Sequence, residues 1–228
     1  MTNPHVAFQS SETLHTKTDA FIRDMQGGAS KPQPKEIEEI MAIFIDEALQ
    51  AFMLRASEAA NLSSGMLKVV NMTCSTISKA TSLVVGRSAR KMDLKQNQDS
   101  ASYMDQVRQP GEDGKAWYVA FPVNEGLAMK GANLPNLCEN GDFEEARREL
   151  EEYLLEVTDE SIHWYFEKPM ALLKFGPVLR KIASVGVETT RKASRSLIHN
   201  LIPKLTEEQL TASCRYQASM LMDFPSRH

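Results

Sequence analysis

The stretch of sequence that decides the fold class is KEIEEIMAIFIDEALQAFMLRASEAA, residues 35–60. Its large apolar residues recur at steps of three and four, which places them on one face of a helix. Ile45 and Leu49 widen that face, so we expect this helix to be largely buried. The residues of the face are Ile37, Ile40, Met41, Phe44, Ala48 and Phe52.

A second helix-packing pattern follows at about 66–92. Val70, Ile77 and Val84 repeat every seven residues, with small residues between them. Small side chains let two helix backbones approach closely. This segment therefore predicts a seam against another helix.

Helical periodicity also marks the segment at about 10–26 and the chain from Asp142 onward. One apolar, small-residue helix is expected over 178–201, and a capping box of Thr206 with Gln209 predicts the start of a last helix. We predict an all-α fold, a helical bundle of about five to seven helices.

The segment at about 93–141 differs because polar and turn-forming residues dominate it. It contains one strand-like run, AWYVAFPV at 116–123, so we expect a long loop with room for a short β-hairpin. A proline-containing linker, SKPQP, ends at residue 34. The predicted organisation is an N-terminal helix and linker, 1–34, and a helical domain, 35–228, interrupted by the long loop.

Length and composition narrow the class of protein. The chain has 228 residues, of which 42% are hydrophobic and 25% charged, and this excludes collagen-like, disulfide-framework and wholly disordered proteins. No apolar run is long enough to predict a transmembrane segment, and no secretory signal is apparent at the start. Three widely spaced cysteines indicate free thiols. We expect a cytoplasmic protein.

The net charge of −4 is a near-cancellation of acidic and basic helical blocks. Residues 35–58 are acidic and 59–92 carry no acid; residues 138–167 are strongly acidic and 168–204 strongly basic. The arrangement appears twice, about 105 residues apart, with a loose similarity between MLKVV and LLKFG. That similarity leaves open whether the chain contains a duplication.

The basic block in the second half supplies the first set of candidate contact residues. They lie on the helix expected over 178–201, where they could form an exposed face for an anionic partner. No aromatic residue accompanies them, which argues against stacking on single-stranded nucleic acid. The candidate residues are Arg180, Lys181, Arg191, Lys192 and Arg195.

The strand-like run supplies the second set. Trp117, Tyr118 and Phe121 would form an aromatic anchor for a partner if the long loop is mobile.

Catalytic motifs are scarce. No glycine-rich phosphate loop, nucleophile elbow or paired-cysteine zinc pattern occurs. Two Glu-x-x-His spacings, Glu12 with His15 and Glu160 with His163, are weak candidates for a di-metal carboxylate site in a helical bundle. Two such spacings also arise by chance in a chain this rich in glutamate, so we predict no enzyme activity, no metal and no cofactor.

The predicted function is that of a non-catalytic helical interaction protein, either a scaffold or a regulatory subunit. It would act through helix packing and the basic helical face, with a protein partner or by self-association. Three alternatives stay open: a nucleic-acid-binding regulator that uses the basic helix, a peripheral lipid- or granule-surface protein, and the di-metal bundle.

Overall fold

The structure is a computed structural model that describes residues 2–225. Over that part of the chain it is 74% helical, with eight helices, when elements that continue into one another are counted as one, and a small four-stranded antiparallel sheet. The predicted helical bundle is therefore confirmed. The helical elements are α1 (Glu12–Gln26), α2 (Pro34–Leu49), η1 (Gln50–Leu54), α3 (Arg55–Ala59), α4 (Ser64–Ala89), α5 (Leu94–Gln106), α6 (Glu125–Glu139), α7 (Phe143–Ile162), η2 (His163–Glu167), α8 (Lys168–Leu172), α9 (Pro177–Leu201), η3 (Ile202–Lys204) and α10 (Glu207–Ser219). The strands are β1 (Thr2–Gln9), β2 (Arg108–Pro110), β3 (Trp117–Pro122) and β4 (Leu221–Pro225).

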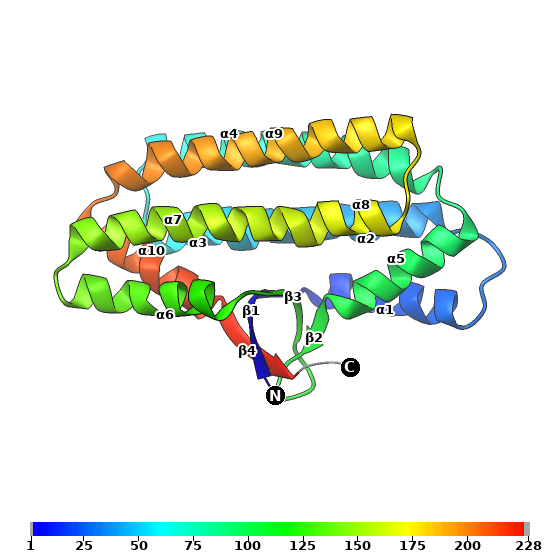
Figure 1. The fold of residues 1–228 in the computed structure, drawn as a ribbon, viewed down its shortest axis with the longest axis horizontal. Coiled ribbons are helices and arrows are strands. Elements are labelled where there is room, and N and C mark those ends of the chain that lie inside the picture. The colour runs from blue at the N-terminus through cyan, green and yellow to red at the C-terminus, as the bar shows by residue number, and fades with distance from the viewer. Residues whose placement is uncertain (1, 226–228) are drawn as a thin grey trace.

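The helices form layers (Figure 1). α4 and α9 lie side by side in one outer layer, and α2 and α7 run beneath them with their continuations α3 and α8. α6 and α10 lie under one end of this middle layer and α1 and α5 under the other, with the sheet between them. The helices η1 and η2 are π-helical turns that join α2 to α3 and α7 to α8 without a break.

Side chains cap the starts of several helices. Ser11 at α1 and Asn124 at α6 each accept the backbone N–H three residues further on. Asp93 at α5 and Thr206 at α10 each form a capping box with a glutamine. The capping box predicted at Thr206 is confirmed.

The two halves of the chain repeat the same order of elements, and the caps recur at matched places in this repeat. Each half runs strand, helix, helix with a π-helical turn, long helix, helix and strand. Residue numbers at matched positions differ by 113, as at the starts of the two π-helical turns, Gln50 and His163. We call residues 2–112 the first repeat and residues 115–225 the second repeat.

Unusual backbone conformations recur at the same spacing. Asn61 and Lys174 both have φ of 48°, a left-handed conformation that is uncommon for residues other than glycine. Gly28 and Gly141 have φ of 91° and 82° at the ends of α1 and α6. The repeat therefore extends to details of the turns.

The spacing of about 105 residues estimated from charge is wrong, because the structural spacing is 113. The similarity between MLKVV at 66–70 and LLKFG at 172–176 aligns the wrong residues. In the structure Lys68 matches Lys181, which lies on α9. Charge blocks locate helices only coarsely, whereas matched turns and caps fix the register.

The sheet also follows the repeat. Its strand order is β2-β3-β1-β4, so the equivalent strands β1 and β3 form the centre and β2 and β4 the edges. Val6 pairs with Phe121 and Phe8 with Val119 in the antiparallel register of β1 and β3. All four are buried, and these alternate positions turn one face of the sheet toward the helices.

The short β-hairpin predicted within about 93–141 is confirmed, because β2 and β3 pair antiparallel. The long loop predicted around it is wrong, because the segment also holds α5 and α6. Several residues that suggested a loop have structural roles: Asn124 caps α6, and Gly131 lies inside it against Tyr153. Residues 1–34 contribute β1, between β3 and β4, and α1, which packs against α5 and α2.

An aromatic cluster joins the two repeats in the core. Phe8 and Phe52 of the first repeat meet edge to face at 5.9 Å between ring centroids, and the matched Phe121 and Tyr165 meet the same way at 5.5 Å. Phe44 contacts Phe8 and Tyr165, so it bridges the two pairs. Rings from β1, β3, α2 and both π-helical turns therefore share one cluster.

Candidate interaction surface

The outer layer of α4 and α9 is built on a close helix crossing. The predicted seam is confirmed, because Val70, Ile77 and Val84 are all buried. A Cβ atom added to Gly186 of α9 would lie 2.6 Å from Cγ2 of Val84, so glycine is needed for this approach. Ser63 caps α4, and Pro177 occupies the first turn of α9, where it needs no N–H partner.

The face of α4 and α9 that points away from the core carries basic residues in matched positions. Lys68 and Lys79 are exposed on α4, and Lys181 and Lys192 are exposed on α9 at the equivalent places. Within each helix the two lysines are eleven residues apart, about three turns, so they share one face. We call this surface, with its four lysines and the aliphatic residues between them, the α4/α9 face.

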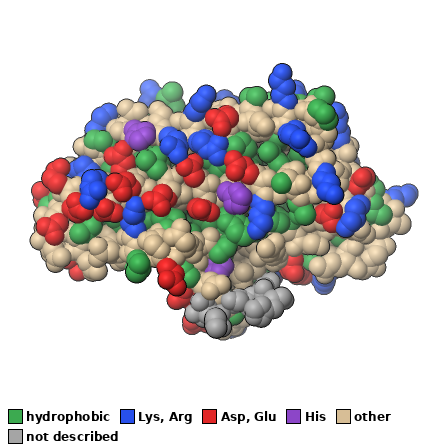
Figure 2. All heavy atoms as spheres, viewed as in Figure 1, with side chains coloured by type: hydrophobic (Ala, Val, Ile, Leu, Met, Phe, Trp, Pro, Cys, Tyr) green, Lys and Arg blue, Asp and Glu red, His purple; other side chains and the backbone are tan. Residues whose placement is uncertain are grey.

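These lysines are not neutralised within the chain. Over residues 2–225 none of the four has an acidic partner, and Arg87 near the end of α4 has none either. Figure 2 shows Lys and Arg side chains along the edge formed by α4 and α9, whereas Asp and Glu gather over α7 and its surroundings. The α4/α9 face is therefore a basic surface on a protein of net negative charge.

Large aliphatic side chains are exposed between the lysines. Met72 on α4 is 62% exposed, and its equivalent Val185 on α9 is 61% exposed. Val69, Leu83 and Val178 on the same two helices are also among the exposed large hydrophobic residues. The α4/α9 face therefore combines unpaired cations with exposed aliphatic groups.

The structure separates the five basic residues predicted from the sequence. Lys181 and Lys192 lie on the α4/α9 face. Arg191 contacts Asp159, Glu167 and Glu188 at 2.7–3.2 Å, and Glu167 raises the pKa of the Arg191 guanidinium through a hydrogen bond.

The two remaining arginines also have partners within the chain. Arg195 forms an ion pair with Asp159, and Arg180 donates to the backbone carbonyl of Phe175 at 3.4 Å. Arg191 and Arg195 therefore bind α9 to α7 and η2, an intramolecular role that the sequence pattern does not reveal.

Trp117, Tyr118 and Phe121 do not lie on a loop as predicted, because all three lie in β3. Phe121 is fully buried in the aromatic cluster. The Trp117 ring stacks on His15 and lies 4.5 Å from the guanidinium carbon of Arg108. Tyr118 packs on Phe224 of β4. Strand pairing and packing within the chain therefore order these rings.

The weak metal candidates do not gather into one site. Glu12 and His15 lie on α1, where burial lowers the pKa of His15 and its ring contacts Trp117. Glu160 and His163 lie at the junction of α7 and η2. Over residues 2–225, no group of three or more His, Cys, Asp or Glu is placed to hold a metal ion.

The sequence contains a signal for the α4/α9 face that the charge blocks obscured. Lys68 and Lys79 lie in the acid-free block, and the Lys-x10-Lys spacing recurs at Lys181 and Lys192. Comparing the two long helices at a separation of 113 residues would have aligned both pairs.

Comparison of the chain with protein-family models, with curated proteins and with solved structures found no match. None of the helices in residues 2–225 is long and apolar enough to cross a membrane.

Proposed function

We propose that this protein is a non-catalytic interaction protein, a scaffold or regulatory subunit, that binds an acidic partner protein through the α4/α9 face. The observation that carries the proposal is the two-fold arrangement of four exposed lysines that have no acidic partner in the described chain. Unpaired cations on one face attract a partner of opposite charge and speed its association.

The aliphatic residues supply the second part of the binding energy. Met72 and Val185 lie between the lysines of their helices, so an apolar contact would be surrounded by charge pairs. Interfaces commonly have this anatomy, with an apolar centre and a polar rim. α4 has 26 residues and is about 39 Å long, enough for a helix of the partner to lie along it.

An acidic protein fits the α4/α9 face better than the other candidate partners. The face carries no exposed aromatic residue for nucleic-acid stacking or for insertion at a lipid interface, and acidic side chains cover α7 nearby. An extended polyanion that binds the α4/α9 face would also reach the acidic side chains over α7, which would repel it. Face-to-face self-association would oppose lysine with lysine, which is unfavourable.

Charge reversal tests this proposal. We expect the substitutions K68E, K79E, K181E and K192E, made together, to weaken binding to the acidic partner at least about 100-fold, because each attractive pair becomes repulsive. The measurement is capture from a nuclease-treated cytosolic extract, followed by titration of the purified captured protein. Duplex DNA and phosphatidylserine vesicles are titrated in parallel.

A matched control keeps the same change in net charge. Lys31, Lys115, Lys174 and Lys204 are exposed and lie outside the α4/α9 face. Their combined replacement by glutamate should leave partner binding within about threefold of the wild type, since long-range effects are screened. Equal losses in both variants, or tighter binding to DNA or vesicles than to any protein, would contradict the proposal.

A further inference from the structure

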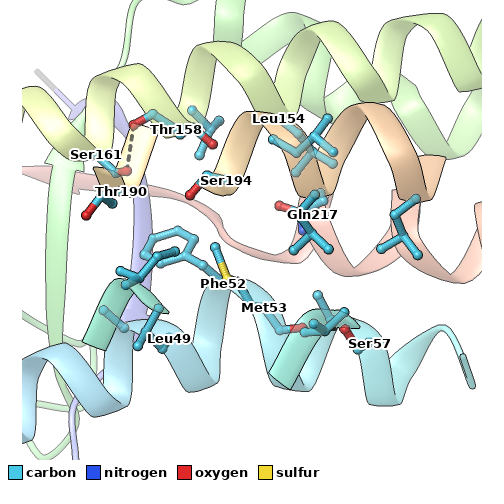
Figure 3. A pocket seen from close by; sticks show the side chains of 18 of the residues that line it. Leu49, Phe52, Met53, Ser57, Leu154, Thr158, Ser161, Thr190, Ser194 and Gln217 are labelled. Carbon is cyan, nitrogen blue, oxygen red and sulfur yellow. Dashed lines mark hydrogen bonds between the residues drawn. The ribbon is translucent and has the colours of Figure 1, made fainter. Parts of the chain in front are cut away.

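A cavity of about 170 Å³ lies inside the bundle, away from the α4/α9 face. It is partly open to the surface, and it is lined by α2, η1, α3 and α4 and by α7, η2, α9 and α10 (Figure 3). Apolar side chains such as Leu49, Phe52 and Leu154 make up most of the wall. An engineered protein cavity of about 150 Å³ stays dry and takes up benzene, so the volume suits a small organic molecule.

Three buried polar side chains in this wall have no hydrogen-bond partner within the described chain. Gln217 and Ser194 are each 4% exposed, and Tyr165 is 8% exposed. Over residues 2–225 the Tyr165 hydroxyl is unpaired, and the side chains of Gln217 and Ser194 make no hydrogen bond. Figure 3 shows Gln217 and Ser194 among the apolar side chains of the wall. Buried polar groups are normally paired, because burying them unpaired costs free energy.

The other repeat shows that the fold does not need these polar groups. Met104 stands at the position that matches Gln217, and it lines a second cavity of about 160 Å³. Thr81 matches Ser194, but its hydroxyl donates to the carbonyl of Ile77 at 2.8 Å. Phe52 matches Tyr165 and has no hydroxyl. The same architecture therefore packs without an unpaired polar group at these three positions.

The π-helical turns bring aromatic side chains to the cavity. η1 supplies Phe52 and Met53, and η2 supplies Tyr165 and Phe166 at the matched positions. π-helical turns are rare and occur frequently at functional sites. Pro169 follows η2 and has no N–H to donate, and the hydroxyl of Tyr103 donates instead to the carbonyl of Trp164.

We propose that this cavity binds a small neutral molecule, mainly apolar and about the size of benzene, that carries one carbonyl or hydroxyl group. The apolar wall would hold the body of the ligand, and the Gln217 amide would bind its polar group. Among the described residues no charged side chain lines the cavity, so a charged ligand would lose its hydration without compensation. The proposal does not depend on the α4/α9 face.

Cyclohexanone and phenol are suitable probes, with toluene as an apolar reference. We expect all three to bind the full chain saturably in calorimetric titrations. Gln217→Met installs the residue found at the matched position. It should weaken cyclohexanone binding about tenfold, because one hydrogen bond is lost, and should leave the affinity for toluene within about threefold of the wild type. Met104→Leu, in the second cavity, is the matched control and should change neither the affinity for cyclohexanone nor the affinity for toluene.

A second variant tests the cavity independently, in case Gln217→Met fails to fold. Ser194→Val narrows the same cavity and should weaken the binding of all three probes more than tenfold. The circular dichroism spectrum should be unchanged. Absence of saturable binding by every probe to the wild type would mean that the cavity holds water or nothing, and would overturn the proposal. Equal effects of Gln217→Met and Met104→Leu on cyclohexanone would overturn it as well.

Discussion

Replacing Phe121 by alanine is expected to lower the free energy of unfolding by about 3–5 kcal/mol. Phe121 is fully buried and contacts Tyr165 and Phe52, so the truncation leaves a cavity where β3 meets both π-helical turns. The measurement is equilibrium unfolding in urea, with the slope of the transition compared between variants.

Met129→Ala is the matched control for this prediction. Met129 lies on α6, shortly after β3 in the chain, and is 68% exposed. Its truncation should change the free energy of unfolding by less than about 0.5 kcal/mol. A similarly small effect of Phe121→Ala would mean that β3 does not pack in the core and that the mobile-loop prediction was right.

The second large effect is expected at Gly131. A Cβ atom at this position would lie 2.5 Å from Cε2 of Tyr153, whose ring is fully buried. Gly131→Thr should therefore cost about 3 kcal/mol through overpacking. In the first repeat, Thr18 stands at the position of Gly131 and Ile40 at the position of Tyr153. The first repeat therefore has the larger residue at one position and the smaller residue at the other.

Because the first repeat has a larger residue at one of these positions and a smaller one at the other, the second substitution should restore part of the stability that Gly131→Thr removes. The double variant G131T/Y153I reproduces the pair found in the first repeat, so it should be more stable than the sum of its single changes by about 1–3 kcal/mol. Gly86→Ala provides the control, because no atom lies within 4 Å of an added Cβ there and alanine favours the helix by about 0.5–1 kcal/mol. Strict additivity of the double variant would contradict the match between the repeats.

Local sequence patterns predict the helical layers well. On the apolar face of residues 37–52, Ile37, Ile40, Phe44 and Ile45 are buried, and the other members are half-buried against the core. The seam at Val70, Ile77 and Val84 is buried as expected, because each pattern reflects burial along a single helix. The seam also predicted a close helix neighbour, which is α9. What these patterns lack is information on which helix lies opposite.

The sheet depends on contacts that no local pattern carries. β1 contains Pro4 and is interrupted by polar residues, and its partner β3 starts more than 100 residues later. β2 has only three residues. Pairing of short strands over such a distance depends on the surrounding helices, and the turn-rich composition at 93–141 therefore resembled a loop.

The register of the repeat and the arginine ion pairs were missed for related reasons. Identical residues at the spacing of 113 are sparse; examples are VAF at 6–8 and 119–121, and Tyr103 with Tyr216. The Tyr216 hydroxyl donates to the carbonyl of Ala51 just as that of Tyr103 donates to Trp164, which is visible only in three dimensions. Asp159 likewise reaches Arg191 and Arg195 from another helix.

Site-specific photo-cross-linking tests the central claim, that the α4/α9 face binds an acidic partner, most directly. A photoreactive phenylalanine derivative replaces Met72 on the face or, in the control, Met129 on α6, which is about equally exposed. We predict that position 72 cross-links to an acidic protein in cytosolic extract, that the cross-link is lost when K68E and K79E are added, and that position 129 yields none. Cross-links to the same protein from position 129 but not from position 72 would contradict the account.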